Sequence, residues 1–380
     1  MSPAEPIRLI QVGAGLMGRH WLDVIGQSTE VELVGLADLD LPLAQHAAAG
    51  AGFADVEVTA TLSELLDRVN ADAVINVTIP EAHADVSSTA LLRGLPVLCE
   101  KPVAHTTSAA LSMVAAAEAS GRLLMVSQSR RYWRNLDALR SQIQRLGRLG
   151  LVECSFFKAP HFGGFREQIP FPLLVDMAIH QFDLARDLIG DEPVWIACES
   201  FNPAWSWYAG DAAADVHAEF ANGTRFMFAG SWCSPGQETS WNGSWRISGS
   251  DGTALWDGDH EPVAQTADGE PIAAAAGTGP EEIAGSLAEF VAALRYGSVP
   301  SGEVHSNVMS LAMVEGAVRS AQTGQPVVLA DLLEDGYVRA LEIEKRPELR
   351  AVLAAWPSVH DVIGNPGRAV PAPQMKGELG

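Results

Sequence analysis

The first third of the chain alternates short apolar runs, rich in β-branched residues, with longer segments rich in Ala and Leu. Such alternation is typical of βαβ units, in which helices join parallel strands that are buried on both faces. Gly94 and Gly121 follow two of the helical segments, where a residue that accepts a left-handed conformation commonly ends a helix. The pattern predicts an α/β fold with a doubly wound parallel sheet. The predicted strands are Ile7–Val12, Val31–Ala37, Ala73–Thr78, Pro96–Cys99 and Leu123–Ser127. The predicted helices are Leu16–Ile25, Leu43–Ala49, Ser63–Arg68, His83–Arg93 and Ser108–Ala119.

After Arg130 the pattern changes to longer segments in which apolar and polar positions alternate. Asn222-Gly223 separates two of these segments and predicts a hairpin with a type I′ turn, because both residues tolerate a positive φ. We expect an α+β region with a mostly antiparallel sheet. Its predicted strands are Leu151–Lys158, Val194–Phe201, Val216–Ala221, Thr224–Ala229, Trp245–Ser248 and Ala254–Asp257. Its predicted helices are Asp137–Leu146, Leu174–Ile189, Glu281–Arg295 and Val304–Ala321.

Length and composition agree with a folded protein of two domains. The chain has 380 residues, of which 47% are hydrophobic and 19% charged. That balance lies in the globular range, and the length exceeds the roughly 100–200 residues of one domain. With 25 basic against 47 acidic residues the net charge is −22, which repels phosphate backbones and anionic lipid headgroups. We therefore expect no nucleic-acid or membrane partner.

The cysteines and the N-terminal residues indicate the cellular compartment in which the protein is expected. The four cysteines lie far apart and form no C-x-x-C pair, so the sequence indicates neither a disulfide framework nor a thiolate zinc site. The first residues lack a basic and apolar leader, and no run approaches the ~18 apolar residues of a membrane span. We expect a cytoplasmic protein.

A glycine-rich motif, Gly13-Ala14-Gly15-Leu16-Met17-Gly18, joins the first predicted strand to a helix. In a G-x-G-x-x-G turn the first glycine permits the tight turn, the second lets a pyrophosphate approach the backbone, and the third lets helix and strand pack closely. Asp38 ends the next strand, 20 residues after Gly18, where an acidic residue accepts the ribose hydroxyls of NAD. Because Leu39 and Asp40 follow it, with neither Arg nor Ser, NAD is favoured over NADP. The alternative is a plain glycine-rich turn.

Two further segments carry titratable side chains in arrangements that suit catalysis. Lys101 follows a predicted strand, at the sheet edge where α/β folds bind ligands, and is one of only four lysines in the chain. The alternative is a surface lysine before a turn proline. Asp176, His180 and Asp183 are spaced i, i+4 and i+7 on a predicted helix, so a carboxylate could orient the imidazole as a base. A structural His–Asp pair is the competing interpretation. No second histidine cluster supplies ligands, so we expect no metal.

Tryptophan is concentrated between residues 195 and 256, which hold seven of the ten in the chain. Trp205 and Trp207 lie in the Pro- and Ser-containing stretch Asn202–Tyr208, where burial in a core is not the obvious explanation. Aromatic faces beside polar loops suit the C–H faces of sugar rings, which makes both candidate substrate-binding residues. Packing at a subunit interface also enriches tryptophan and remains an alternative.

These motifs together resemble the Gfo/Idh/MocA family, the glucose-fructose oxidoreductase and inositol dehydrogenase group. The resemblance rests on the glycine-rich turn, on Glu100-Lys101-Pro102 and on Asp176-x-x-x-His180. It implies a Rossmann domain followed by a domain with a large open-faced sheet that forms homodimers or homotetramers. The sequence departs from the family in lacking glycines around Asp176: Pro170-Phe171-Pro172-Leu173-Leu174 precedes it and Ala178 follows it.

The resemblance also implies roles for single residues. Lys101, Asp176 and His180 would be catalytic, and Glu100 would lie near the nicotinamide ribose. Thr78, Pro80 and His83, in the segment Thr78–His83, would line the cofactor, as would Leu16 and Met17 of the glycine-rich turn. Arg131, in Ser129-Arg130-Arg131-Tyr132, would reach the substrate, whereas the other arginines up to Arg148 read as a solvated helix face. The Lys101–Pro102 bond would be cis.

The resulting expectation is an NAD-dependent oxidoreductase that transfers a hydride between the nicotinamide and a secondary hydroxyl of a sugar, cyclitol or glycoside. We expect an NAD-binding Rossmann domain over residues 1–127, a domain for substrate binding and oligomerisation over 128–364, and a Pro- and Gly-rich tail over 365–380. Three alternatives stay open. They are a glycoside-cleaving enzyme that oxidises and re-reduces its substrate with retained NAD, a non-catalytic dinucleotide sensor, and an NADP-linked reductase of a keto sugar.

Overall fold

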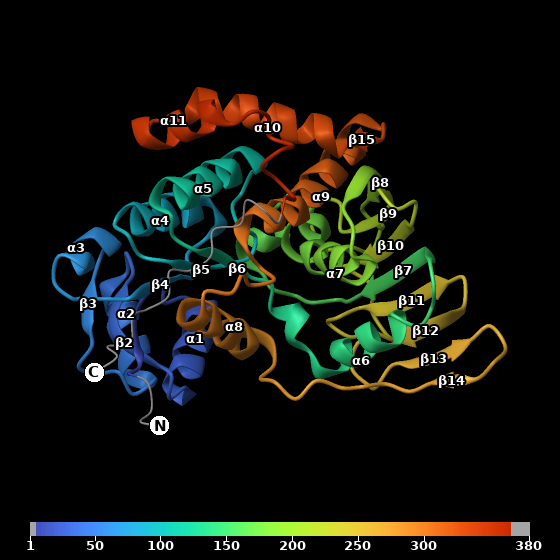
Figure 1. Ribbon diagram of the computed structural model, residues 1–380, viewed down its shortest axis with the longest axis horizontal. Coiled ribbons are helices and arrows are strands. Elements are labelled where there is room, and N and C mark those ends of the chain that lie inside the picture. Colours follow the sequence, from blue (N-terminus) through green and yellow to red (C-terminus); the bar gives the residue numbers. More distant parts are fainter. Residues whose placement is uncertain (1–4, 366–380) are drawn as a thin grey trace. The chain divides into compact units, whose positions relative to one another are not determined.

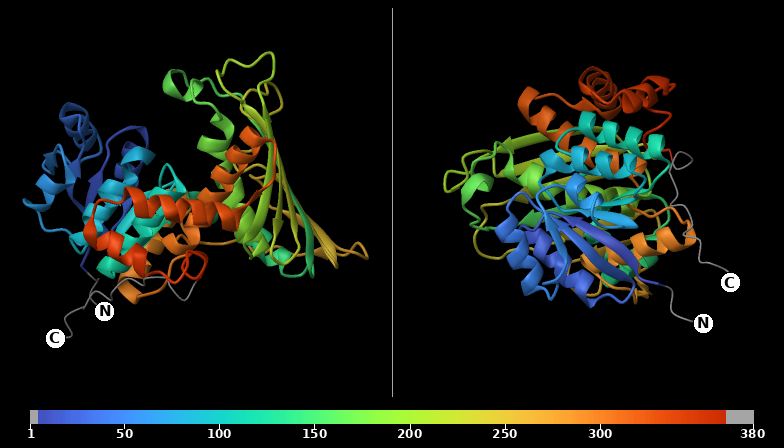
Figure 2. Two further views of the ribbon diagram at one scale, coloured as in Figure 1. Left: turned by 90° about the horizontal axis from the view of Figure 1, so that it is seen from above. Right: turned by 90° about the vertical axis from the view of Figure 1, so that its left-hand side faces the viewer.

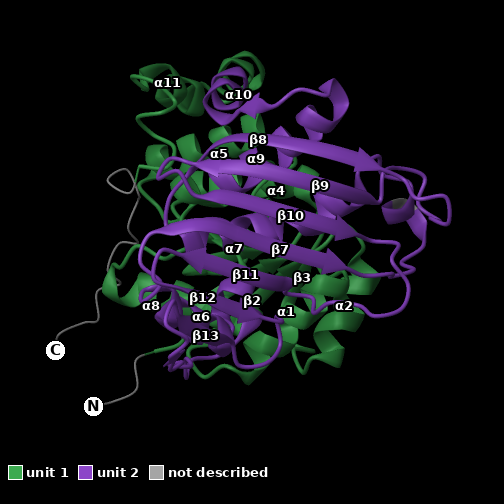
Figure 3. Cartoon of the chain, turned by 90° about the vertical axis from the view of Figure 1, so that its right-hand side faces the viewer, with its two compact units in different colours: residues 1–129, 283–308, 336–380 green, residues 130–282, 309–335 purple. Residues whose placement is uncertain are grey.

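A computed structural model describes residues 5–365 of the chain (Figure 1). Contacts within the chain divide it into two units, coloured separately in Figure 3. Unit 1 contains residues 1–129, 283–308 and 336–380, and unit 2 contains residues 130–282 and 309–335. Unit 1 is therefore assembled from three separate segments of the chain.

The sheet of unit 1 has six strands, all parallel, in the order β3-β2-β1-β4-β5-β6. Helices cover both of its faces (Figures 1 and 2). The predicted doubly wound sheet is confirmed. The strand order reverses between β1 and β4, which is where such sheets bind ligands at their carboxyl edge. The strands are β1 (Ile7–Val12), β2 (Val31–Ala37), β3 (Glu57–Thr59), β4 (Ala73–Asn76), β5 (Val97–Glu100) and β6 (Leu124–Ser127).

Local signals begin and end the helices of unit 1. The side chains of Asp40, Thr61 and Thr106 accept hydrogen bonds from the first turns of α2, α3 and α5. Gly94 and Gly121 both have a positive φ just after helices, as predicted. The helices are α1 (Leu16–Gln27), α2 (Leu41–Gly50), α3 (Leu62–Leu66), α4 (Pro80–Leu92), α5 (Thr107–Ser120), α8 (Glu282–Tyr296) and α11 (Pro347–Ala355). Two more helices, α9 (Val304–Thr323) and α10 (Leu329–Ile343), each divide between the two units.

A buried charged cluster ties the C-terminal segments to α5. Trp356 donates from Nε1 to Glu118 on α5 at 2.6 Å, and His305 lies 2.7 Å from Glu303 and 3.5 Å from the other oxygen of Glu118. The residues join three distant parts of the chain within unit 1. A buried charge without a partner is costly, so packing that separates these groups is disfavoured. The cluster therefore favours the observed packing of the C-terminal segments against α5.

The sheet of unit 2 has nine strands in the order β14-β13-β12-β11-β7-β10-β9-β8-β15. All neighbours are antiparallel except β10 and β7, so the predicted mostly antiparallel sheet is confirmed. The unit's helices lie against one face and the other face is open within the unit (Figures 2 and 3). The strands are β7 (Leu149–Phe157), β8 (Pro193–Phe201), β9 (Ala213–Phe220), β10 (Arg225–Ser231), β11 (Ser244–Gly249), β12 (Gly252–Trp256), β13 (Val263–Thr266), β14 (Pro271–Ile272) and β15 (Val327–Val328). Its other helical segments are η1 (Ser129–Tyr132), α6 (Arg134–Ile143), η2 (Gly164–Glu167), η3 (Leu173–Ala178) and α7 (Ile179–Ile189).

Two local predictions in unit 2 are wrong in detail. The hairpin at Asn222-Gly223 exists, but only Gly223 has a positive φ, so the turn is not type I′. Four residues separate the strands instead of two, and a longer loop needs one left-handed residue. The helix predicted over Leu174–Ile189 is π-helical over Leu173–Ala178 and α-helical only from Ile179. An apolar pattern over six residues does not separate these two helical periods.

Among residues 5–365, no helix combines the length and the apolar character that crossing a membrane requires. The predicted tail over residues 365–380 lies, apart from Asn365, outside the described residues.

Candidate functional site

The glycine-rich turn between β1 and α1 has the geometry that a dinucleotide phosphate needs. Gly13 has φ +105°, and a Cβ there would lie 2.4 Å from the carbonyl oxygen of Val77. A Cβ on Gly18 would lie 2.3 Å from the carbonyl oxygen of Gly13, so only glycine permits this packing. A Cβ on Gly15 would meet nothing within 4 Å, and no side chain caps α1 there. The backbone at Gly15 therefore leaves the N-terminus of α1 accessible to an anion.

Asp38, directly after β2, has a second role that sequence reasoning missed. Its Oδ2 accepts a hydrogen bond from the backbone N–H of Ala14 at 2.7 Å, and its Oδ1 accepts one from Asp40 at 2.9 Å. The carboxylate is thus fixed beside the glycine-rich turn, at the carboxyl edge of the sheet. Leu39 and Ile79, which follow the ends of β2 and β4, are exposed apolar side chains at the same edge. These residues fit an NAD molecule, whose ribose hydroxyls donate to a carboxylate and whose adenine packs on apolar surface.

Glu100 is the last residue of β5, and Lys101 follows it directly. Glu100 is buried, and its carboxylate accepts hydrogen bonds from Trp21 Nε1 at 2.8 Å and from the Lys101 backbone N–H at 3.1 Å. Burial raises the pKa of Glu100, although the charge of Lys101 opposes this. The Lys101–Pro102 peptide bond is cis, as the resemblance predicted. Trp21 on α1 therefore links the glycine-rich turn to the Lys101 segment.

His83 and Asn76 hold the neighbouring strand end. His83 is buried, and its ring nitrogens lie 2.8 Å from the carbonyl oxygen of Pro102 and 3.0 Å from that of Thr78. Burial lowers the pKa of His83. Asn76 accepts hydrogen bonds from the N–H and hydroxyl of Thr78 and donates to the carbonyl of His83. His83 thus braces the turn that carries Lys101, and its predicted contact with the cofactor, like that of Pro80, stays a prediction.

Asp176 and His180 lie on consecutive helical segments of unit 2. Asp176 is half-buried in π-helical η3, where its Oδ2 lies 3.6 Å from Nε of Arg166. His180 is buried in the first turn of α7. A π-helical turn frequently occurs at functional sites, because its wider turn changes the direction of the side chains. Lys101 belongs to unit 1, whereas Asp176 and His180 belong to unit 2.

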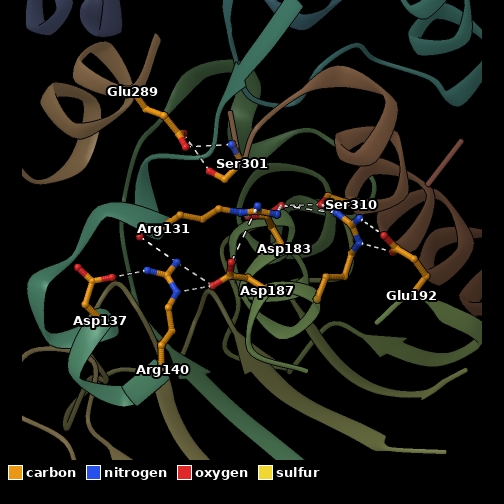
Figure 4. Close-up of polar contacts among 10 residues, drawn as sticks. Arg131, Asp137, Arg140, Asp183, Asp187, Glu192, Glu289, Ser301 and Ser310 are labelled. Carbon is orange, nitrogen blue, oxygen red and sulfur yellow. Dashed lines mark hydrogen bonds and ion pairs between the residues drawn. The ribbon is translucent and has the colours of Figure 1, made fainter. Parts of the chain in front are cut away.

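Asp183 serves a different partner from the one that its spacing suggested. Arg131 in η1 donates two hydrogen bonds to its carboxylate, from Nε at 2.7 Å and from Nη2 at 2.8 Å (Figure 4). The hydroxyl of Ser310 donates to Asp183 at 2.6 Å and accepts from Arg186 at 2.6 Å. Asp183 is therefore part of a buried ion-pair network that joins η1, α7 and α9. The predicted contact of Arg131 with substrate stays a prediction.

The second layer of this network lies on α6. Arg140 pairs with Asp187 on α7 at 2.7 Å and donates to the carbonyl oxygen of Arg131 at 3.0 Å (Figure 4). Its Nη1 also donates to Asp137 at 2.6 Å. The sequence predicted that Arg140 lies on a solvated helix face. In the structure its side chain instead holds α6 against α7. Sequence spacing within one helix could not reveal pairs between helices.

The two candidate tryptophans differ in their surroundings. Trp205 is 65% exposed, and its Nε1 donates to the carbonyl oxygen of Cys233 at 2.8 Å. Trp207 is half-buried and stacks on the ring of His161, with ring centroids 3.7 Å apart and planes at 20°. Packing inside unit 2 accounts for Trp207 but not for the exposed face of Trp205.

Comparison with known families identifies the fold and its cofactor class. The model of the Gfo/Idh/MocA oxidoreductase family with an NAD-binding Rossmann fold matches residues 7–128, and the model of the Gfo/Idh/MocA C-terminal domain matches residues 114–255. The chain belongs to the Gfo/Idh/MocA family. Family membership confirms the resemblance and makes the chain an oxidoreductase with an NAD-binding Rossmann fold.

Relatives of this family member differ in how much of the chain they cover. An uncharacterized protein y4oX of Sinorhizobium fredii is 27% identical over 88% of this chain and 98% of its own length. Inositol 2-dehydrogenase 4 of Saccharopolyspora erythraea is 34% identical over 50% of this chain, and the match spans 56% of its own length. An oxidoreductase of Agrobacterium radiobacter, solved in complex with NAD⁺, L-tartaric acid and magnesium, has a TM-score of 0.79 at 19% identity and covers 87% of this chain and 100% of its own. The last likeness shows the fold alone.

Within the described part of the chain, no group of three or more His, Cys, Asp or Glu side chains could hold a metal ion. The residues that sequence reasoning missed are mainly supports: Trp21 and Asn76 in unit 1, and Ser310 and Arg186 in unit 2. None of them belongs to a motif. The hydrogen bonds from Trp21 to Glu100, from Asn76 to His83, from Arg186 to Ser310 and from Ser310 to Asp183 join residues 7 to 127 positions apart along the chain, so no short motif signals them.

Proposed function

We propose that this protein is an NAD-dependent dehydrogenase that oxidises a secondary hydroxyl of a sugar, cyclitol or glycoside. The observation that carries the proposal is the arrangement at the carboxyl edge of the unit 1 sheet. There the accessible backbone at Gly15, the fixed carboxylate of Asp38 and the braced Lys101 segment follow three strands of one sheet. Curated relatives named inositol 2-dehydrogenases, which match half of the chain, support a polyol-like substrate.

The first part of the mechanism concerns the cofactor. Gly13, Gly15 and Gly18 with Leu16 and Met17 would hold the pyrophosphate, Asp38 the adenosine ribose, and Glu100 with Thr78 and Pro80 the nicotinamide side. When bound, NAD supplies a hydride acceptor at its nicotinamide ring. The carboxylate of Asp38 would repel a 2′-phosphate, which favours NAD over NADP.

The second part concerns the hydroxyl that is oxidised. His180 accepts its proton, because an imidazole is the side chain most often used as a general base. Lys101 donates a hydrogen bond to the same oxygen and stabilises the negative charge that develops as the proton leaves. Asp176 orients His180 or a neighbouring hydroxyl. Arg131, Trp205 and Trp207 remain the proposed contacts to the rest of the substrate.

The test measures the near-ultraviolet absorbance of NADH after mixing the protein with NAD and a panel of polyols, monosaccharides and glycosides at mildly alkaline pH. We expect Lys101→Ala and His180→Ala to abolish most of the turnover while NAD binding persists. Lys345→Ala, at an exposed lysine, is the matched control and should leave turnover unchanged. Full turnover in the Lys101 variant would contradict the mechanism. NAD binding without NADH release, but with release of an aglycone, would indicate the glycoside-cleaving alternative.

We also propose that the open face of the nine-stranded sheet mediates a homodimer or homotetramer. Figure 3 shows that unit 2's helices leave one face of this sheet uncovered. Glu153, Arg246 and Leu255 are paired across β7, β11 and β12, and their side chains are half-buried or exposed within the chain. Light scattering of the purified chain, compared with an Arg246→Glu variant, tests this assignment. A wild-type monomer would refute it.

A further inference from the structure

Three loops meet at one edge of the unit 2 sheet. Strands β7 and β10 are parallel, and β8 and β10 are both antiparallel to β9, so β7, β8 and β10 end at the same edge. The loops that follow them cover residues 158–172, 202–212 and 232–243. The first loop leads directly into η3, so Asp176 also lies at this edge.

Aromatic side chains connect the three loops. The hydroxyl of Tyr208 donates to the carbonyl oxygen of Pro160 at 2.8 Å, and Trp207 stacks on His161. Phe162 contacts Trp232 with ring centroids 5.0 Å apart. Tyr208 and Trp232 are buried, so packing accounts for these two rings.

Packing does not account for Trp205. It is 65% exposed, and its one polar atom already donates to Cys233. The surface that it presents is therefore the apolar face of an indole ring whose orientation is fixed. Phe162, Trp241 and Val175 are also exposed at this edge. Exposed large apolar side chains that gather at one place on a surface commonly mark a binding site.

A chain of contacts joins this edge to the proposed catalytic carboxylate. The guanidinium of Arg166 lies 4.9 Å from the ring centroid of Phe162, and its Nε lies 3.6 Å from Asp176. Phe162 contacts Trp232, and Trp205 binds the next residue, Cys233. All of these contacts lie within unit 2. The exposed indole is therefore continuous with the surroundings of Asp176.

The charged side chains at this edge indicate whether a bound ligand would be neutral or charged. Lys158 pairs with Glu238 at 3.0 Å, and Arg166 pairs with Asp176. Both cations already face a carboxylate, so they offer little to an anionic ring. A neutral ring with an apolar C–H face matches an indole surface in which the N–H is already satisfied.

We propose that Trp205 binds a second, neutral ring of the substrate, so that the preferred substrate is a glycoside or disaccharide and not a single-ring sugar or cyclitol. The inference rests on the proposed dehydrogenase function, because it places the reacting ring beside Asp176. Trp205 contacts the ring that does not react, which makes it a specificity-determining residue.

The experiment compares single-ring and two-ring ligands that share the same first ring. The single-ring probes are glucose, methyl glucoside and myo-inositol, and the two-ring probes are phenyl glucoside and cellobiose. If the NADH assay finds another single-ring substrate, that substrate and its phenyl glycoside are added. Wild type is compared with Trp205→Ala, with Trp205→Phe, which keeps an aromatic face, and with the control Trp195→Ala. Trp195 lies at the opposite end of β8, and its Nε1 is likewise bound, to Glu219 at 2.8 Å.

We expect Trp205→Ala to raise KM for the two-ring substrates by about tenfold, which is the affinity that one stacked ring contributes. The same variant should keep kcat/KM for single-ring substrates within about twofold of the wild-type value. Trp205→Phe should recover most of the loss, and Trp195→Ala should show neither effect. An equal loss for both substrate sizes, or no loss for the two-ring substrates, would overturn the proposal.

Titration calorimetry of the NAD-loaded protein with the same ligands tests the ring contact without turnover. If wild type releases no NADH with any substrate, the dehydrogenase function fails, but a tighter two-ring ligand that Trp205→Ala weakens would still support the second-ring site. If the variant instead changes the oligomeric state and leaves ligand affinity unaltered, Trp205 belongs to a subunit interface and the proposal is wrong.

Discussion

Replacing Arg131 by Met should destabilise unit 2 strongly, because it removes the cation that donates two hydrogen bonds to the buried Asp183 carboxylate, whose other cation, Arg186, lies 3.9 Å away. The side chains of Arg131 and Asp183 are only 8% and 1% exposed and share two hydrogen bonds of 2.7 and 2.8 Å. Although burial opposes it, the Asp183 carboxylate raises the pKa of Arg131 above its usual value. Removing one partner of such a pair typically costs about 3–5 kcal/mol.

The matched control is Arg225→Met on β10. Arg225 pairs with Glu219 at 2.9 Å, but these side chains are 51% and 32% exposed. Water solvates both charges when the pair is broken, so we expect a loss of about 0–1 kcal/mol. The two variants remove the same side chain from two ion pairs that differ in burial.

Calorimetric melting and urea unfolding of the full chain measure the difference. For a unit of this size a loss of 3–5 kcal/mol corresponds to a fall in Tm of roughly 6–20 °C, against less than about 4 °C for the control. Asp183→Asn should cost a similar amount to Arg131→Met, and the double variant should cost less than the sum because both changes break one interaction. Equal and small losses in the Arg131 and Arg225 variants would refute the reasoning.

Three further predictions concern unit 1. Although burial opposes it, Glu118 and Glu303 raise the pKa of His305 to about 9, above the 6.5 of an ordinary histidine. The protonated ring therefore contributes fully to the free energy of unfolding below pH 6.5, and this contribution, about 3 kcal/mol, is lost as the pH rises towards 9. In urea unfolding, the free energy of unfolding of His305→Gln should fall less between pH 6.5 and 9 than that of the wild type. Gly18→Ala should abolish NAD binding in fluorescence titration, because its Cβ would overlap a carbonyl oxygen at 2.3 Å, and unchanged affinity would contradict the proposed fit of the turn. Asp38→Ala should weaken NAD binding and reduce the preference for NAD over NADP in the same titration, whereas an unchanged ratio of the two affinities would remove Asp38 from the cofactor site.

The residues that the sequence revealed are those whose chemistry depends on neighbours along the chain. The turn from β1 to α1 is one continuous segment, and Asp38 is reached by a single helix and strand, so their spacing alone predicts a dinucleotide site. Most strands of both sheets were predicted, because period-two alternation and buried apolar runs are local patterns. The strands β3, β13, β14 and β15 were not predicted, because each has only two to four residues and so carries little of either pattern.

Other features were decided by contacts between distant segments. Residues 283–308 and 336–365 return to unit 1, where Trp356 and His305 bind Glu118 on α5. The helices α10 and α11, which the sequence pattern did not predict, belong to this C-terminal region.

The same holds for the candidate site. From its spacing Asp183 was a partner for His180, yet it binds Arg131, 52 residues away in sequence. Trp205 and Trp207 were equivalent in the sequence, but one is stacked on His161 and the other is exposed. The sequence by itself determined the fold class, the cofactor turn and the candidate residues, because periodicity and short-range spacing encode them. Only the tertiary structure decided which charge each buried group meets and which aromatic ring stays exposed, because burial and pairing depend on segments that are distant along the chain.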